Sequence, residues 1–194
     1  MSSSSRGADS DAYPRPVRKP PAGFVQPAAV VRRTGRAPRS RAALRVFEGL
    51  AGIPAYDDDL DPPAAVRELR RAMEVADAVV IATPEYNASL PGHLKNALDW
   101  ASTPLPTNPL KDKPVAVVGA STGLFGAVWA QAELRKVLSV IGADVIDREL
   151  PVAQADTAFD ENGRLNDSGL HSTLLAIVQQ LTGASDGADF AESA

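Results

Sequence analysis

The chain of 194 residues contains no cysteine and only two histidines, His93 and His171. The absence of cysteine excludes a disulfide framework, a dithiol redox centre, a cysteine nucleophile and a cysteine-ligated zinc site. No apolar run approaches the roughly 18 residues of a membrane-spanning helix, and the amino end lacks the apolar stretch of a secretory signal. We therefore expect one cytoplasmic domain that has no contact with a membrane.

Positive charge is concentrated towards the amino end of the chain. Nine lysine and arginine residues and no acidic residue lie between Ala12 and Phe47, and six prolines lie between Pro14 and Pro38. Because proline removes an amide donor and interrupts helices, residues 1–43 are predicted to be a disordered basic segment. Such a segment can attract nucleic acid by charge alone, but nucleic-acid binding is the weaker interpretation here.

The remainder of the chain alternates between strand and helix patterns. Continuous apolar runs predict buried strands, and apolar residues three and four positions apart predict helices. The predicted strands are 45–47, 78–82, 114–119 and 142–147, and the predicted helices cover 62–76, 92–101, a segment that ends near 141, and 174–181. This alternation predicts an open parallel α/β sheet with helices on both faces, within a domain at 44–183 followed by a polar tail at 184–194.

Open parallel sheets bind ligands beyond the carboxyl ends of their strands. The loop after the strand at 78–82 runs from Thr83 to Gly92 and combines proline, an aromatic residue and several polar groups. Tyr86 is suited to stack on a planar ligand, but an ordinary loop whose tyrosine covers the sheet edge explains the same residues equally well.

The continuous stretch TPEYNASLPGHLKNALDW, from Thr83 to Trp100, resembles the NADPH-dependent FMN reductase family of flavodoxin-like enzymes. The resemblance implies FMN as cofactor, NADPH or NADH as co-substrate, and a flavin, a quinone or a similar small molecule as electron acceptor. It also implies a homodimer or homotetramer. The flavin ring is then expected against a loop that contributes mainly backbone atoms, formed by Pro84, Glu85, Tyr86 and Asn87.

The loop after the strand at 114–119 allows two interpretations. Its small residues let the backbone approach a planar ring, and the following helix directs its amino end at the ligand. Its glycine and serine spacing also fits the nucleophile elbow of a serine hydrolase, with the order Ser121, Asp156 or Asp160, and His171. We favour the first interpretation because His171 lies at a predicted helix start and the loop resembles the family's second flavin loop, formed here by Ser121, Thr122 and Gly123.

The resemblance covers about Val46 to Leu181 and fails at the amino end. Family members begin with a buried strand and a Gly-Ser-x-Arg loop that binds the FMN phosphate. Here suitable residue types occur in a different order, as Thr34, Gly35, Arg36, Arg39 and Ser40. The first strand and the phosphate loop are therefore predicted to be missing or degraded, which would leave the edge of the strand at 78–82 unpaired. One hypothesis is that residues before about Leu44 derive from an altered reading frame.

The sequence thus predicts an NAD(P)H-dependent FMN reductase or quinone reductase. The flavin carries the chemistry, so no catalytic side chain and no metal ion is expected, and the three aspartates at 57–59 are interpreted as a solvated acidic loop. Two alternatives stay open: a relative that no longer binds FMN and is inactive, and, less favoured, the serine hydrolase.

Overall fold

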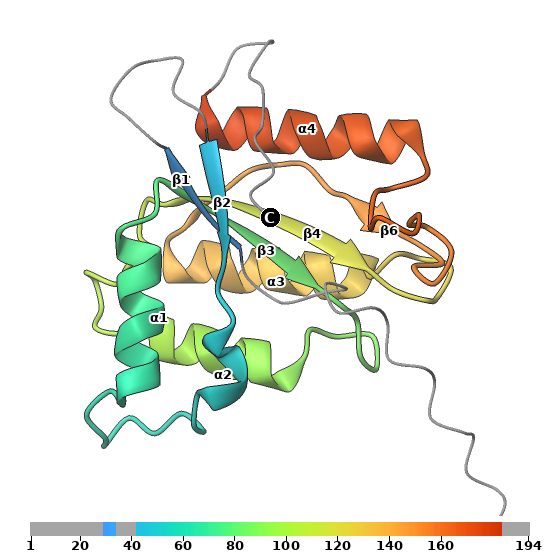
Figure 1. Cartoon of the computed structure of the whole chain (residues 1–194). Helices are drawn as coiled ribbons and strands as arrows, with labels where there is room; N and C mark the ends of the chain where they lie inside the picture. Colours follow the sequence, from blue (N-terminus) through green and yellow to red (C-terminus); the bar gives the residue numbers. More distant parts are fainter. Residues whose placement is uncertain (1–28, 34–41, 184–194) are drawn as a thin grey trace, which may run out of the picture.

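A central sheet organises the computed structural model, which describes residues 29–33 and 42–183 (Figure 1). The spatial order of the strands is β2–β1–β3–β4–β5, and β6 also pairs with β4. The strands are β1 (Ala29–Arg33), β2 (Ala42–Val46), β3 (Ala78–Thr83), β4 (Pro114–Ala120), β5 (Asp144–Val145) and β6 (Pro151–Val152).

The parallel half of the sheet agrees with the prediction from the sequence. Strands β3 and β4 run parallel over five residue pairs; β3 is almost entirely buried, and the residues of β4 are buried or half-buried. Strand β5 pairs with the beginning of β4 and β6 with its end, so together they form one interrupted parallel strand. Strand β6 was not predicted, since two residues are too few to produce a periodic pattern.

The amino-terminal half of the sheet differs from the prediction. Strand β1 lies between β2 and β3 and runs antiparallel to both, with Ala29 opposite Val80 and Val31 opposite Ala78. The prediction of an unpaired edge on β3 is therefore wrong, because β1 supplies its hydrogen-bonding partner. The prediction of disorder is likewise wrong for Ala29–Arg33. The remaining amino-terminal predictions, including the residues at 34–40, and the tail at 184–194 lie outside the described residues.

Helices cover both faces of the sheet. Their bounds are α1 (Ala64–Glu74), α2 (Gly92–Ala101), α3 (Val128–Ile141) and α4 (Ser168–Thr182), with a short 3₁₀ helix η1 at Gly49–Gly52. Helix α4 begins earlier than predicted because the carboxylate of Asp167 accepts a hydrogen bond from the amide of Leu170 at 2.8 Å and caps the helix. None of the helices in the described ranges has the length and apolar composition needed to cross a membrane.

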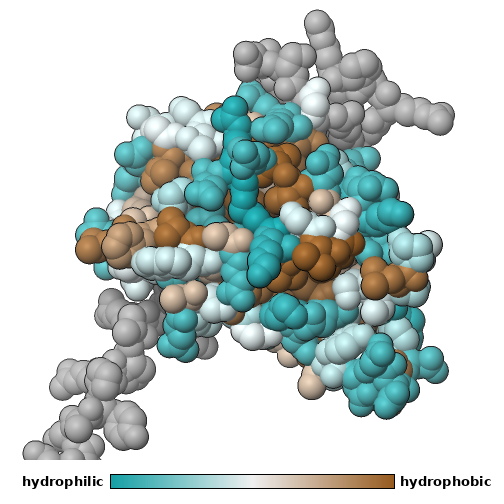
Figure 2. Space-filling model, turned by 180° about the vertical axis from the view of Figure 1, so that it is seen from behind, coloured by the Kyte–Doolittle hydropathy of each residue, from teal (hydrophilic) through white to brown (hydrophobic). Residues whose placement is uncertain are grey.

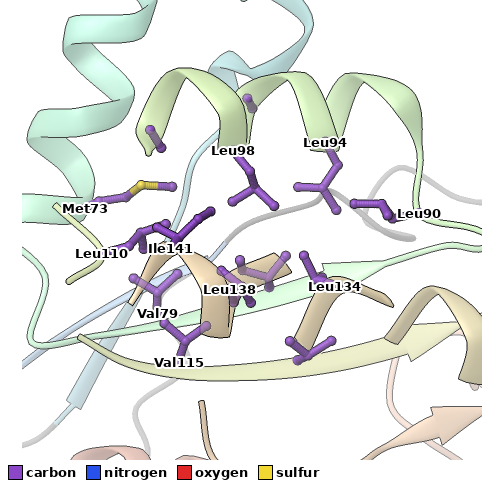
Figure 3. Packing of buried hydrophobic residues seen from close by; sticks show 14 of the residues in the cluster. Met73, Val79, Leu90, Leu94, Leu98, Leu110, Val115, Leu134, Leu138 and Ile141 are labelled. Carbon is purple, nitrogen blue, oxygen red and sulfur yellow. The ribbon is translucent and has the colours of Figure 1, made fainter. Parts of the chain in front are cut away.

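Alternating residues of β3 and β4 divide the core into two layers. Val79 and Val115 contribute to the larger layer, which α1, α2 and α3 cover (Figure 3). Val80 and Ala116 contribute to the layer under α4. Both faces of these strands are buried, so their carboxyl ends are held rigidly beneath the loops that follow them.

Candidate functional site

The loop after β3 is a tight turn that projects Tyr86 into solvent. Tyr86 and Ser89 exchange backbone hydrogen bonds of 3.0 and 3.1 Å across the turn. Asn87 and Ala88 both have positive φ angles, 53° and 57°, as a type I′ turn requires. Tyr86 remains 59% exposed, so its ring is free to pack against a ligand. Thr83, fully buried at the end of β3, donates from its hydroxyl to the carbonyl of Pro84 at 2.8 Å.

Glu85 connects this loop to the beginning of α3. Its carboxylate oxygen Oε2 accepts hydrogen bonds from the amides of Trp129 at 3.0 Å and Ala130 at 3.1 Å. The cap residue Ala127 has a positive φ angle of 63° and provides no side-chain acceptor. Glu85 therefore replaces the missing cap and places a negative charge at the positive end of the helix.

A second polar contact ties the same loop to the same helix. The hydroxyl of Ser89 donates to Oε2 of Glu133, one turn further along α3, at 2.6 Å. Together the two contacts fix the loop at 84–89 beside the loop that precedes α3. The structure thus brings together two segments that the sequence places more than thirty residues apart.

The loop after β4 exposes backbone donors. The Ser121 amide donates to Val152 at 3.0 Å, and the Ser121 hydroxyl accepts from the Gly123 amide at 3.1 Å. Thr122 and Gly123 are exposed. Within the described part of the chain, the amides of Thr122, Leu124 and Phe125 have no hydrogen-bond acceptor, so they are available to a ligand. No hydrogen bond links Ser121 to His171 among these residues, and nothing in the geometry favours the hydrolase interpretation.

Two aromatic residues beside these loops were not singled out from the sequence. Phe125 and Trp129 stack edge to face with ring centroids 5.0 Å apart. They are 60% and 48% exposed, which is unusual for large aromatic side chains. No local signal singles them out, because Phe125 precedes α3 and the left-handed Ala127 lies between them, so the helical spacing rule does not apply.

The acidic loop at 57–59 lies away from the strand ends. It borders an open pocket of about 310 Å³ together with Tyr56, Arg70 and Trp100. Burial lowers the pKa of Arg70, whose guanidinium donates to the carbonyl of Trp100 at the end of α2. The hydrogen bond to Asp58 raises the pKa of Tyr56. No group of three or more potential metal ligands occurs among the described residues.

Comparisons with known proteins agree with this architecture. The model of the NADPH-dependent FMN reductase family matches residues 27–157, more than half of the chain. An NAD(P)H-dependent FMN reductase of Pseudomonas aeruginosa is 42% identical over 136 residues, which cover 68% of this chain and 73% of that protein. A 2-hydroxy-1,4-benzoquinone reductase of Burkholderia sp. is 37% identical over 122 residues, which cover 61% and 67%.

A solved structure supports the same relationship. The flavoenzyme NAD(P)H:(acceptor) oxidoreductase FerB from Paracoccus denitrificans superposes with a TM-score of 0.61 at 38% identity. The superposition covers 69% of this chain and 75% of that one. The chain therefore belongs to the NADPH-dependent FMN reductase family.

Family membership confirms the predicted flavodoxin-like fold and the oxidoreductase class, with FMN and NAD(P)H as the groups on which the family depends. It also extends the predicted resemblance, because the match begins at residue 27 rather than at Val46. The roles of individual residues in the two loops stay predictions.

Proposed function

We propose that this chain catalyses NAD(P)H-dependent reduction of a flavin, a quinone or a similar small acceptor, with hydride transfer through FMN at the carboxyl edge of the sheet. The observation that carries the proposal is the contact of Glu85 with the amides of Trp129 and Ala130. This contact joins the two loops to which the resemblance assigns flavin binding, formed by Pro84, Glu85, Tyr86 and Asn87 and by Ser121, Thr122 and Gly123.

FMN, when bound, supplies the chemistry of accepting a hydride from NAD(P)H and passing two electrons to the acceptor. The residues of this chain supply position and shape. The free amides of Thr122, Leu124 and Phe125 suit the carbonyl oxygens and ring nitrogens of a flavin, which accept hydrogen bonds. The exposed ring of Tyr86 is suited to pack against a planar group.

The side chain of Glu85 acts in this proposal as a positioning group. Its carboxylate accepts hydrogen bonds from two amides of α3, so its contribution to flavin binding comes through its backbone and through the placement of the two loops. A carboxylate held this way also reduces the positive potential at the amino end of α3.

Homo-oligomer formation and a cytoplasmic location complete the proposal. Support for an oligomer comes from large apolar side chains that remain exposed, such as Leu105 (71%), Leu124 (73%) and Val140 (81%). Figure 2 shows hydrophobic residues in patches between hydrophilic ones on the back of the molecule. Contact with a second copy would remove such surface from water.

A direct test combines flavin binding with turnover. We expect the purified full chain to quench the fluorescence of added FMN and to oxidise NADPH in the presence of a quinone. Gly123→Leu should weaken both, because a side chain there blocks close approach of the backbone to the ring. Gly52→Leu is the matched control, since a Cβ atom at Gly52 meets nothing within 4 Å.

Two results would contradict the proposal. One is a purified chain that neither binds FMN nor oxidises NADPH with any of several quinones. The other is a Gly123→Leu variant that binds FMN as tightly as the parent chain, because the loop after β4 would then not contact the flavin.

A further inference from the structure

The described part of the chain buries three polar side chains, and one of them lies directly beneath the loop after β4. The three residues are Thr83, Asn108 and Gln131. Gln131 lies near the beginning of α3 and has no exposed surface. Burying an amide costs free energy unless its donor and its acceptor both find partners, so a fully buried glutamine requires a structural reason.

Both ends of the Gln131 amide are hydrogen-bonded to the backbone. Nε2 donates to the carbonyl of Gly126 at 3.0 Å, and Oε1 accepts from the amide of Leu150 at 3.3 Å. The rest of the side chain packs against Gly119 at the end of β4, where a Cβ atom would lie 2.9 Å from Cγ of Gln131. The segment that Oε1 contacts leads into β6, which lies beside the arrowhead of β4 in Figure 1. This glutamine therefore holds the loop after β4 against the edge of the sheet.

The loop after β4 is held at its beginning, in its middle and at its end. The amide of Ser121 donates to β6 at 3.0 Å, and the carbonyl of Gly123 accepts from the segment after β6 at 3.1 Å. The carbonyl of Gly126 accepts from the buried glutamine. Leu124 and Phe125 lie between the second and the third of these contacts, and their amides have no acceptor among the described residues. The contact at Gly126 thus closes the part of the loop that offers free donors.

Gly126 depends on outside contacts for its conformation. Its φ angle is 58°, and a Cβ atom there would lie 2.5 Å from the carbonyl carbon of Pro151. Glycine restricts its own dihedral angles less than other residues do. The close backbone of Pro151 fixes one side of Gly126, and Gln131 fixes the direction of its carbonyl. Without Gln131 the peptide unit after Gly126 can rotate, and the amides that precede it lose a fixed direction.

We propose that Gln131 is a positioning residue for the flavin: it holds the loop after β4 in the shape that directs the free amides of Leu124 and Phe125 at the ring. The inference rests on the proposed function. Because Gln131 is fully buried, its effect reaches the flavin through the loop and not through contact. Methionine has a similar size but supplies no donor and only a weak acceptor, so Gln131→Met removes the two hydrogen bonds and keeps most of the packing.

Asn108 provides a matched control at the other end of α3. It is also buried, its Nδ2 donates to the carbonyl of Ile141 at 3.1 Å, and its Oδ1 accepts from the amide of Leu110 at 3.0 Å. Ile141 ends α3 and Leu110 precedes β4, so these contacts lie at the edge of the sheet opposite the loop after β4. Asn108→Leu and Gln131→Met each replace one buried amide by an apolar side chain of similar size. We expect similar losses of stability in urea denaturation.

The test measures FMN binding by the folded full-length variants, with the fold checked by circular dichroism. We expect the Kd for FMN to rise about tenfold in Gln131→Met, which corresponds to one or two neutral hydrogen bonds lost. In Asn108→Leu it should stay within about twofold of the parent value, because distant sites act independently. At saturating FMN, the visible absorption bands of the flavin should shift towards those of free FMN in Gln131→Met alone, because these bands respond to hydrogen bonds on the ring. A role in stability alone would leave the bands unchanged.

Gly119→Ala provides a second way to displace the same side chain, because its Cβ atom would lie 2.7 Å from Nε2 of Gln131. It should raise the Kd for FMN in the same direction, and it carries the test if Gln131→Met does not fold. Parental FMN affinity in these variants, or losses equal to that of Asn108→Leu with the parental spectrum, would overturn the inference and leave the proposed function intact. Absence of FMN binding by the parent chain would instead refute the proposed function, and this inference with it.

Discussion

The side chain of Gln131 fills the space that a side chain at Gly119 would occupy. A Cβ atom at Gly119 would lie 2.7 Å from Nε2 of Gln131, closer than van der Waals contact allows. Gln131 is fully buried, and its amide donates to Gly126 at 3.0 Å and accepts from Leu150 at 3.3 Å. One buried amide therefore links α3 to the loop after β4 and to the segment before β6.

Gly119→Ala should destabilise the protein by displacing this amide. Overpacking a core typically costs about 1–3 kcal/mol, and a displaced Gln131 would leave two backbone groups without partners. Urea denaturation should show a lower free energy of unfolding for Gly119→Ala and little change for Gly52→Ala, where a Cβ atom meets nothing within 4 Å. Equal stability of the two variants would contradict this interpretation.

Glu85→Ala should remove the cap of α3 and loosen the two loops. Loss of a helix cap costs about 1 kcal/mol, so the free energy of unfolding should fall by that order. Glu85→Gln should lower the free energy of unfolding by less, because the side-chain carbonyl oxygen of glutamine still accepts a hydrogen bond from one amide. Glu68→Ala, an exposed substitution on α1, serves as control. If Glu85→Ala leaves both stability and FMN affinity unchanged, the contact has no positioning role.

Ala88→Gly should stabilise the protein. Ala88 has a φ angle of 57°, a left-handed conformation that costs an alanine about 1–2 kcal/mol. Glycine adopts it freely but loses about 0.4–1 kcal/mol through the entropy of the unfolded chain, so a small net gain remains. The matched control is Ala132→Gly, at an exposed position of α3, which should destabilise the protein by about 1 kcal/mol. Thermal unfolding should therefore show a higher Tm than that of the parent chain for Ala88→Gly and a lower Tm for Ala132→Gly.

Asp160 should contribute stability that disappears in acid. The backbone hydrogen bond from Arg164 is the main cause that lowers its pKa, aided by the amide of Asn162 and the charge of Arg164. Because the pKa is lower in the folded than in the unfolded state, the contribution is complete above the ordinary aspartate pKa of about 3.9. It is lost as the pH falls through the lower pKa of the folded state.

The corresponding experiment measures unfolding free energy against pH for Asp160→Ala and the parent chain. The difference between them should be constant near neutral pH and should shrink in acid, below the ordinary aspartate range. Glu161→Ala is the neighbouring control. A difference for Asp160→Ala that grows as the pH falls would have the wrong sign and would contradict the assignment.

The local pattern of apolar residues was sufficient to predict the strands and helices that carry the candidate site. The apolar runs predicted β3 and β4, the spacing of Leu94 and Leu98 predicted α2, and the spacing of Leu134 and Leu138 predicted α3. Both strands are buried on two faces, and such burial leaves a continuous apolar run in the sequence. The position of the two candidate loops could also be predicted, because both come directly after these strands and parallel strands present their carboxyl ends at one edge of the sheet.

Pairing between distant residues could not be predicted in this way. The antiparallel placement of Ala29–Arg33 against β3 depends on long-range backbone hydrogen bonds, and a proline-rich neighbourhood concealed it. The capping of α3 by Glu85 joins residues more than forty positions apart, and no local pattern in either segment indicates it.

The sequence by itself therefore determined the family, the two loops and the buried strands beneath them, because side-chain periodicity and a continuous motif are local properties. Only the tertiary structure decided that β1 runs antiparallel to β3 and that Glu85 caps α3. The direction of a strand and the cap of a helix depend on which groups can form hydrogen bonds with their backbone, and here those groups belong to segments far away in the chain.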